Sequence, residues 1–397
     1  MDTKETLDKV QQDAAAGDVH AAYQLGMRYA EGEGGVEESL EKAAGWLGKA
    51  AENGHYHALH KLFRLAEEYC NGREEDSYGI IKGILATAER GYPEGQSQFG
   101  WFRLQGKGTS GSTRDAMRWF LLSNGHGATR SFELAREVLW PKGEYIPGGQ
   151  SIVEYFRVRA LAGDAEMQFC LGACYKHGMV FASPDATEAV NWLIKSAQQG
   201  FSAAQYLLGN MYYLGDQVER NIPEAEKWVR KSAEQGNAGA EYLLGEFLLK
   251  GVVGASDPVA AVEWYKKAVK HGNVDACLAL GMLYEEEKDI PKNLVEAAKC
   301  YKKAILVVPA LAVHPVAAFR LGNLFYSGEE VGKDDEAAFE YWNLAAIHGM
   351  LEARRNLAIM HMSGALEVKG GTERAMQLLK EAADAGDDVA KEYLAKL

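Results

Sequence analysis

Two stretches near the middle of the chain decide the fold. Residues 203–215 read AAQYLLGNMYYLG and residues 225–236 read AEKWVRKSAEQG. The same pair returns as GAEYLLGEFLLKG at 239–251 and AVEWYKKAVKHG at 261–272, which is 36 residues later. A unit of this length with fixed glycine and tryptophan positions is typical of a helix-turn-helix solenoid.

A closing glycine recurs through the whole chain. It ends the second stretch of each unit and returns at steps of 36 or 37 residues, with a single step of 77 that holds two units. The closing glycines are Gly17, Gly54, Gly91, Gly127, Gly163, Gly200, Gly236, Gly272, Gly349 and Gly386. In the long step Val308 takes the place of the glycine, beside an insertion around PALAV. The spacing therefore predicts repeats of one length from end to end.

The closing glycines predict ten repeats and two unpaired end helices. Each repeat begins with helix A, which carries the Leu-Gly stretch, and ends with helix B, which carries the tryptophan stretch. The expected boundaries are about 18–54, 55–91, 92–127, 128–163, 164–200, 201–236, 237–272, 273–308, 309–349 and 350–386. Single helices at 5–16 and 388–396 flank the array as caps. We expect one all-α solenoid over 1–397, in which each hairpin shares its core only with adjacent hairpins.

Two columns of the repeat predict how helices A and B pack. Nine residues after a closing glycine comes a second, mid-helix glycine, which costs about 1 kcal/mol relative to alanine. We expect helices A and B to cross most closely there, because close packing would offset that cost. The mid-helix glycines are Gly26, Gly100, Gly172, Gly209, Gly245, Gly281 and Gly322. Eight residues before the closing glycine stands a large residue that would be buried between repeats. These large residues are Trp46, Trp119, Tyr155, Trp192, Trp228, Trp264, Tyr341 and Leu378.

A third column predicts where each helix B begins. Seven residues before the large residue stands a side chain that can accept a hydrogen bond from an unpaired helix N–H. These residues are Ser39, Ser112, Asp185, Asn221, Asp257, Asn293 and Asp334. Four of them have an acidic residue three positions later, as in a capping box. The acidic residues are Asp115, Glu188, Glu224 and Glu296.

The combination of these columns resembles the Sel-one-like repeats, a subclass of the tetratricopeptide-type helical repeats. The resemblance covers nearly the whole chain and implies a right-handed superhelix that scaffolds protein–protein contacts. Two repeats depart from the pattern, and we expect their helix spacing and surface to differ. In the second repeat Phe63 replaces the mid-helix glycine and Gly83 replaces the tryptophan. In the fourth, Arg136 replaces the glycine, and a loop rich in proline and glycine at 141–149 precedes helix B.

The composition excludes several classes of partner. The formal net charge is −13, from 43 Lys and Arg against 56 Asp and Glu. Nucleic acids and anionic lipids favour basic surfaces, so neither is an expected partner. The first residues, MDTKETLDKVQQDAAAG, have no apolar core of the signal-peptide kind. The five cysteines are scattered rather than arranged as a disulfide framework. We expect a cytoplasmic protein, with a mature exported chain as the alternative.

No catalytic or cofactor motif is complete. The segment Gly106 to Gly111 matches G-x-G-x-x-G, but it falls between two predicted helices instead of after a strand, so no nucleotide cofactor is expected. His55, His57 and His60 could hold a metal ion, but they have no fourth ligand at a suitable spacing.

Two further sets of residues that resemble ligands have a structural explanation in the repeat. Cys170, Cys174 and His177 have ligand-like spacing, yet Cys174 aligns with apolar residues of other repeats. We expect these thiols to behave as small apolar side chains. Three histidines precede closing glycines, at the C-terminus of a helix B. These are His126, His271 and His348.

Helix A carries the candidate binding surface. Positions −3, +1 and +4 from the mid-helix glycine lie on one side of a helix. In tetratricopeptide repeats the equivalent positions line the concave groove, so the resemblance implies that they bind a partner here. We call this set the helix-A stripe, and its candidate binding residues are Trp101, Tyr206, Asn210, Tyr213, Tyr242, Glu246, Met282, Glu285, Asn323 and Tyr326. Aromatic rings beside amide and carboxylate groups suit recognition. The alternative is that the −3 aromatics only pack against the next helix A.

The sequence thus predicts a non-enzymatic scaffold or adaptor that binds a protein segment along the helix-A stripe. Because the stripe contains Glu246 and Glu285 and no arginine, we expect a basic or amide-rich partner. One alternative is a metal-dependent enzyme or metal-binding module built on the divergent second and fourth repeats. Another is an exported protein of the envelope or of host contact.

Overall fold

The computed structural model describes residues 2–53, 55–69, 74–106, 109, 111–128, 131, 147–178, 184–286, 290–305, 314–363 and 371–396. These residues form helices joined by turns, with no strand among them. The helices form two compact units, Met1–Asn273 and Val274–Leu397, which we call unit 1 and unit 2. The expected all-α solenoid is confirmed.

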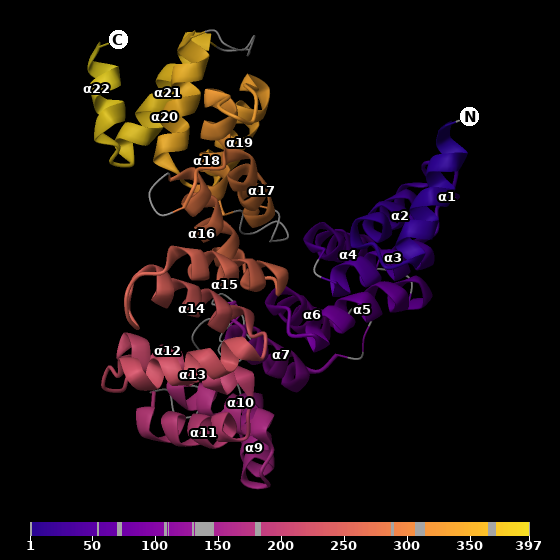
Figure 1. The fold of residues 1–397 in the computed structure, drawn as a ribbon, viewed down its shortest axis with the longest axis vertical. Coiled ribbons are helices and arrows are strands. Elements are labelled where there is room, and N and C mark those ends of the chain that lie inside the picture. Colours follow the sequence, from indigo (N-terminus) through magenta and orange to yellow (C-terminus); the bar gives the residue numbers. More distant parts are fainter. Residues whose placement is uncertain are drawn as a thin grey trace. The chain divides into compact units, whose positions relative to one another are not determined.

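Unit 1 begins with the single helix α1 (Asp2–Ala15) and continues as helix pairs (Figure 1). The pairs are α2 (Val19–Glu31) with α3 (Leu40–Glu52), α4 (Tyr56–Tyr69) with α5 (Glu74–Glu89), α6 (Pro93–Gln105) with α7 (Thr113–Gly125), α10 (Ala165–Lys176) with α11 (Ala186–Gln198), α12 (Ser202–Leu214) with α13 (Ile222–Glu234), and α14 (Ala238–Leu249) with α15 (Pro258–Lys270). Helix B of the fourth repeat is α9 (Pro147–Leu161). Its predicted helix A, including Arg136, lies outside the described residues.

Unit 2 has the same construction. Its pairs are α16 (Val274–Glu285) with α17 (Leu294–Ile305), α18 (Pro315–Ser327) with α19 (Asp335–Ile347), and α20 (Leu351–Ser363) with α21 (Gly371–Asp384). The last helix, α22 (Asp388–Lys396), packs on α21. In both units a helix A is followed by a helix B, and each pair packs on the next pair along the chain (Figure 1).

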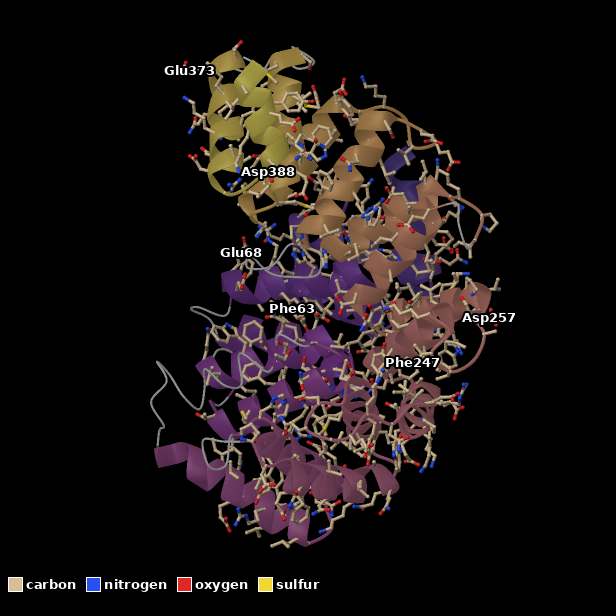
Figure 2. The ribbon with its side chains drawn as sticks, turned by 90° about the vertical axis from the view of Figure 1, so that its left-hand side faces the viewer. Phe63, Glu68, Phe247, Asp257, Glu373 and Asp388 are labelled. Carbon is tan, nitrogen blue, oxygen red and sulfur yellow. The ribbon has the colours of Figure 1, made fainter. Side chains whose placement is uncertain are left out.

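The N-caps predicted at the start of seven helices B are confirmed. Asp185 Oδ1 accepts the N–H of Glu188 at 3.0 Å, and Asn221 Oδ1 accepts that of Glu224 at 3.1 Å. The same bond forms at Ser39, Ser112, Asp257, Asn293 and Asp334. Asp257 lies at the start of α15 (Figure 2).

Two of the four acidic residues at the third helical position have a further contact that sequence reasoning missed. Glu188 accepts the indole N–H of Trp192 at 3.0 Å, and Glu224 accepts that of Trp228 at 3.0 Å. The cap therefore also fixes the orientation of the large side chain one turn later.

The mid-helix glycines lie where helices A and B cross most closely, as predicted. A methyl group on Gly209 would come within 2.7 Å of Val229 Cγ2 and 3.0 Å of the Val229 backbone nitrogen. On Gly245 it would come within 2.6 Å of the Tyr265 ring. A side chain of any size at these positions would push the two helices apart.

The large residues of helix B are buried to different degrees. Trp119, Trp192, Trp228 and Leu378 are at most 8% exposed, as expected. Tyr155 is 36% exposed, with the Arg114 guanidinium 4.5 Å from its ring centre. The expectation of burial is therefore wrong for Tyr155, which belongs to the divergent fourth repeat.

The second repeat packs differently, as its sequence predicts. Phe63 takes the place of the glycine and is buried (Figure 2), and α5 packs more extensively on α3 than on its own partner α4. Gly48 and Gly83 make this approach possible, because a methyl group on Gly83 would lie 3.4 Å from Gly48 Cα. In the fourth repeat α9 begins at Pro147, so the last residues of the loop expected at 141–149 are helical instead. Proline suits the first helical turn because its missing N–H is not needed there.

The expectation that hairpins contact only their neighbours is wrong in unit 1. Helix α7 contacts α12, and its end also contacts the start of α14, 112 residues later in the chain. Asn237 donates a hydrogen bond to the Gly125 carbonyl at 2.9 Å, and a methyl group on Gly239 would lie 2.8 Å from Gly127 Cα. Paired glycines let the two backbones touch, which a pattern of repeat columns does not reveal.

A ladder of buried side chains stabilises the turns of unit 1. Gln168 donates to the Ala160 carbonyl at 3.1 Å and accepts from Gln199 at 2.8 Å. Gln205 makes the same two bonds, with Ala197 and Gln235. Each glutamine thus joins the end of one repeat to the end of the next. Sequence reasoning missed this column, although it stands five residues after every closing glycine involved.

Candidate functional site

In unit 1 the predicted stripe residues lie at partly exposed positions. Trp101, Tyr206, Asn210, Tyr213, Tyr242 and Glu246 are all half-buried or exposed, and Trp101 is 38% exposed. The Tyr206 ring would lie 2.9 Å from a methyl group on Gly239, at the start of the next helix A. The Tyr213 ring lies 4.7 Å from that of Phe247, also on the next helix A. For Tyr206, an aromatic at position −3, this packing role is the alternative interpretation. Tyr213, at position +4, packs on the next helix A as well, which the alternative did not include.

Glu246 is already engaged within unit 1. Its Oε1 accepts a hydrogen bond from the Tyr265 hydroxyl at 2.5 Å, and its Oε2 pairs with the Lys250 ammonium group. The nearby cation offsets part of the charge that the carboxylate would offer a basic partner. Desolvation by burial raises the pKa of Tyr265 and the Glu246 carboxylate adds to it, so this phenol stays protonated and donates.

In unit 2 the stripe contains Met282, Glu285, Asn323 and Tyr326. The first three are half-buried, and Tyr326 is 39% exposed. Glu285 Oε2 accepts from the Tyr301 hydroxyl and from Arg320 Nη1, the latter at 3.0 Å. Burial is the main reason that the pKa of Tyr301 is raised, and the Glu285 hydrogen bond adds to it. This carboxylate, too, has an intramolecular cation beside it.

Three aromatic residues link the mid-helix glycines to the stripe. Tyr265, Tyr301 and Trp342 each follow the large-residue column by one position, and each is at most 3% exposed. Their rings press against the mid-helix glycines, where methyl groups would lie within 2.4 to 2.6 Å of ring atoms. Their polar ends reach Glu246, Glu285 and Asn323, respectively. Because the glycine has no side chain, the buried aromatic ring can pass beside it. The polar end of the ring then forms a hydrogen bond that fixes the orientation of a stripe residue.

Sequence reasoning missed these aromatic partners. The signal was present: the same column holds Leu193 and Val229 in the fifth and sixth repeats and changes to hydrogen-bonding aromatics in the seventh to ninth.

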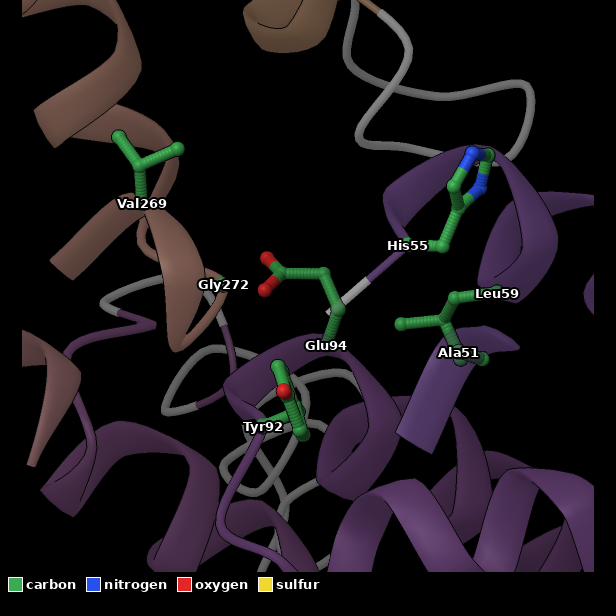
Figure 3. Close-up of a pocket in the computed structure, with 7 residues that line it drawn as sticks. All are labelled: Ala51, His55, Leu59, Tyr92, Glu94, Val269 and Gly272. Atoms are coloured by element: carbon green, nitrogen blue, oxygen red, sulfur yellow. The ribbon is translucent and has the colours of Figure 1, made fainter. Parts of the chain in front are cut away.

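A small hollow in unit 1 lies apart from the stripe. It is lined by Ala51, His55, Leu59, Tyr92, Glu94, Val269 and Gly272, and the Glu94 carboxylate points into it from α6 (Figure 3). Tyr92 closes one side, since a methyl group on Gly272 would lie 2.9 Å from its ring. The hollow is another place where unit 1 folds back on itself.

The histidine cluster is arranged around Tyr23 in α2. The His55 ring stacks on Tyr23 with 4.3 Å between ring centres, and His57 lies 5.8 Å from His55. His55 Nδ1 accepts the N–H of Ala58 at 3.3 Å, at the start of α4. Burial lowers the pKa of His60, with smaller contributions from Arg64 and His57. Within the described ranges no group of three His, Cys, Asp or Glu side chains is arranged to hold a metal ion.

The cysteines expected to be apolar are buried. Cys170 and Cys174 lie inside unit 1, and burial raises the pKa of Cys174 to about 12. Burial also lowers the pKa of His177 to about 3. The segment Gly106 to Gly111 follows helix α6 rather than a strand, although Lys107, Gly108 and Ser110 lie outside the described residues.

The histidines before closing glycines terminate their helices, as predicted. His126, His271 and His348 are the C-caps of α7, α15 and α19. His126 Nδ1 lies 2.8 Å from the Leu122 carbonyl and 3.0 Å from Gln96 Oε1. Burial lowers the pKa of His126 to about 4.

Comparison with known families identifies the repeat. The profile of the Sel1 repeat matches residues 19–55, 93–127, 165–201, 202–237, 238–273, 274–306, 315–350 and 351–387. The chain belongs to the Sel1 repeat family. Residues 56–92 and 128–164, which the Sel1 profile leaves unmatched, correspond to the divergent second and fourth repeats.

Solved Sel1-like structures resemble this chain. The protective antigen c5321 of uropathogenic Escherichia coli, described as displaying an SLR fold, is 26% identical with a TM-score of 0.53, over 98% of this chain and 82% of that one. A Sel1 repeat protein from Oxalobacter formigenes is 27% identical with a TM-score of 0.52, over 60% of this chain and 95% of that one.

A curated relative matches about half of this chain. Chitin synthase regulatory factor 3 of Schizosaccharomyces pombe is 25% identical over 228 residues, which is 52% of this chain. The match spans only 23% of that protein. Sel1 repeat proteins are generally scaffolds for protein interactions and are typically not enzymes. None of the described helices has both the length and the apolar composition needed to cross a bilayer.

Proposed function

We propose that this chain is a non-catalytic adaptor that binds a segment of a partner protein along its helix-A stripe. The observation that carries the proposal is the combination of half-exposed aromatic and polar side chains on successive helices A. In unit 2 the stripe presents Tyr326 beside Asn323, and both rest on the buried Trp342. A rigid aromatic group next to an oriented polar group is the usual composition of a binding hot spot.

The same contacts refine the kind of partner. Glu246 and Glu285 each have an intramolecular cation, Lys250 and Arg320, so the preference for a basic partner should be weaker than the sequence alone predicts. The stripe amides of Asn210 and Asn323 carry no charge that such a cation could offset. We therefore propose that hydrogen bonds to the stripe amides contribute more than net charge.

The test compares charged substitutions on the stripe with matched substitutions on the outer helices. The stripe variant is Asn210→Arg plus Asn323→Arg, with one change in each unit. The control is Asn191→Arg plus Asn343→Arg, which changes two exposed asparagines on helices B by the same charge. We expect crosslinking and mass spectrometry in a lysate of the source organism to show partners that the control retains and the stripe variant loses. Equal recovery by both variants would remove the stripe from the proposed function.

A second candidate is an exported protein in contact with a host. The similar Escherichia coli protein is a protective antigen, which favours this candidate, while a cytoplasmic location is our leading proposal. Fractionation of the source cells followed by immunoblotting separates the two, because only the exported form would be recovered outside the cytoplasm.

A further inference from the structure

Unit 2 contains a pair of asparagines of which the predicted stripe includes only one. Asn323 follows the mid-helix Gly322 in α18, and Asn356 lies on the next helix A, α20. Asn356 Nδ2 donates to Asn323 Oδ1 over 3.3 Å. The two amides therefore form a direct bridge between successive helices A, on the side of the repeat that carries the stripe.

The orientation of both amides is fixed by chemistry. Trp342 Nε1 donates to Asn323 Oδ1 at 3.0 Å, and an indole nitrogen is a donor only. The Asn323 atom that faces Trp342 must therefore be the oxygen. Since Asn356 faces that same oxygen, its nearest atom must be the nitrogen. Trp342 is 3% exposed and holds this arrangement from the core of the α18–α19 pair.

The remaining polar atoms of the pair are a donor and an acceptor side by side. Among the described residues, no partner is found for Asn323 Nδ2 or Asn356 Oδ1, although both side chains are half-buried. Neither is among the buried side-chain atoms without a partner, so both reach solvent and can bond a ligand in place of water. A donor next to an acceptor matches the carbonyl oxygen and N–H of a polypeptide main chain. Side chains of a partner are not needed for this match.

We propose that Asn323 and Asn356 bind the main chain of an extended segment of a partner protein. Asn323 Nδ2 donates to a carbonyl oxygen of the segment, and Asn356 Oδ1 accepts from an N–H. The inference rests on the proposed function and specifies how the stripe of unit 2 performs it.

The neighbouring side chains suit an extended segment. Tyr326 is 39% exposed and lies 5.1 Å from the Trp342 ring, and the Lys333 ammonium group lies 5.6 Å from its ring centre. One helix A earlier, Glu285 uses Oε2 for Tyr301 and Arg320, while no hydrogen bond to Oε1 occurs within the described chain. Packed helices lie about 8–10 Å apart, and an extended chain advances about 3.3 Å per residue. A basic side chain about three residues along the segment would therefore reach Glu285.

The test uses peptides in which single N–H groups are removed. Twelve-residue peptides are selected from a random display library on the full-length protein, and those whose binding is lost in Asn323→Arg are kept. Each amide is then replaced in turn by an ester, which removes one N–H and leaves every side chain in place. We expect one ester to weaken binding about 3- to 10-fold, the range for one hydrogen bond. The same ester should have no effect on the Asn356→Ala variant.

A second pair of variants separates binding from folding. Asn323→Asp keeps the oxygen that Trp342 and Asn356 use but removes the outward donor, so peptide affinity should fall at least 10-fold. Asn343→Asp adds the same charge at the adjacent exposed position of α19 and should leave affinity unchanged. Melting curves verify that both variants remain folded. Peptides that depend on Asn323 but tolerate every ester would overturn main-chain binding and leave the proposed function standing. A library that gives no peptide sensitive to Asn210→Arg or Asn323→Arg would overturn both.

Discussion

Units 1 and 2 are built from the same helical hairpin but differ in which hairpins contact each other. In unit 1 the turn after α7 returns to the starts of α12 and α14, and glycines 125, 127 and 239 let these backbones touch. Among the described helices of unit 2, the main packing contacts join only helices that follow one another in the chain. The comparison teaches that a repeat array closes on itself where small residues face each other and stays accessible where polar residues take their place.

The same contrast extends to individual columns. Two positions before the mid-helix column, the fifth to seventh repeats have Cys170, Leu207 and Leu243, all buried. The ninth and tenth repeats have Arg320 and Asn356, which pair with stripe residues of the preceding helix A. The first three repeats are also polar there, with Gln24, Lys61 and Gln98. A buried apolar residue strengthens the core, whereas an oriented polar residue prepares a surface for a ligand. By this criterion the ninth and tenth repeats have a better-prepared binding surface than the fifth to seventh.

The largest expected effect concerns the core of unit 1. Trp228→Ala removes a side chain that is 7% exposed and hydrogen-bonded to Glu224, so the free energy of unfolding should fall by about 3–5 kcal/mol. Hydrogen exchange of the full chain should show the loss of protection in unit 1 and leave α18 to α22 protected. Chemical denaturation measures the loss itself. An unchanged midpoint would refute the packing of this column, and equal loss of protection in both units would remove the contrast between them.

The next effect concerns the contact that closes unit 1. Gly239→Ala would force the new methyl group against Gly127 Cα, and overpacking of this kind costs about 1–3 kcal/mol. Gly45→Ala is the matched control, because Gly45 lies inside helix α3 with open space around it and alanine there should add up to about 1 kcal/mol. Thermal melting compares the two. If both substitutions stabilise the protein, the close approach of the two turns is wrong.

The smallest effect is a pH dependence of the same turn. Burial holds the pKa of His126 at about 4, against about 6.5 for an unfolded histidine. Between these values the unfolded chain binds more protons, so the free energy of unfolding falls as the pH is lowered from 6.5 to 4. Since the residue is partly exposed, we expect a loss of roughly 2 kcal/mol.

His126→Gln is the variant that isolates this contribution. Glutamine stands in the same column at Gln199 and Gln235, where it donates to the glutamine that corresponds to Gln96. The variant should keep that bond and be less sensitive to acid than the natural chain. Urea denaturation at pH 7 and pH 4.5 measures the difference. Parallel pH profiles would show that His126 does not become protonated in this range while the protein is folded.

Much of the fold could be read from the columns of the repeat. The caps at Asp185 and Asn221, the crossing at Gly209 and the ends of helices at His126 and His271 each depend on residues within one hairpin. Such local contacts recur wherever the residues recur, so one correct unit predicts the others. The stripe positions followed from the same helical geometry, and the structure places all ten at partly exposed sites.

The partners of the stripe residues could not be read in the same way. Tyr265 donates to Glu246 across a pair of helices, and Asn356 reaches Asn323 from the following repeat. Each link depends on which side chain extends through the gap beside a glycine. A pattern aligned column by column does not record that distance. The exposure of Tyr155 was also missed, in the repeat whose sequence departs from the pattern.

The sequence by itself determined the repeating hairpin, its caps and the partly exposed face of helix A that carries the stripe. These features follow from helical periodicity and short-range hydrogen bonds. Only the tertiary structure decided that unit 1 folds back onto its own third repeat and that the amides of unit 2 are held by a buried indole. Both features depend on backbones and side chains far apart in the sequence meeting at van der Waals distance. That meeting is set by the accumulated geometry of several repeats and not by the composition of any one of them.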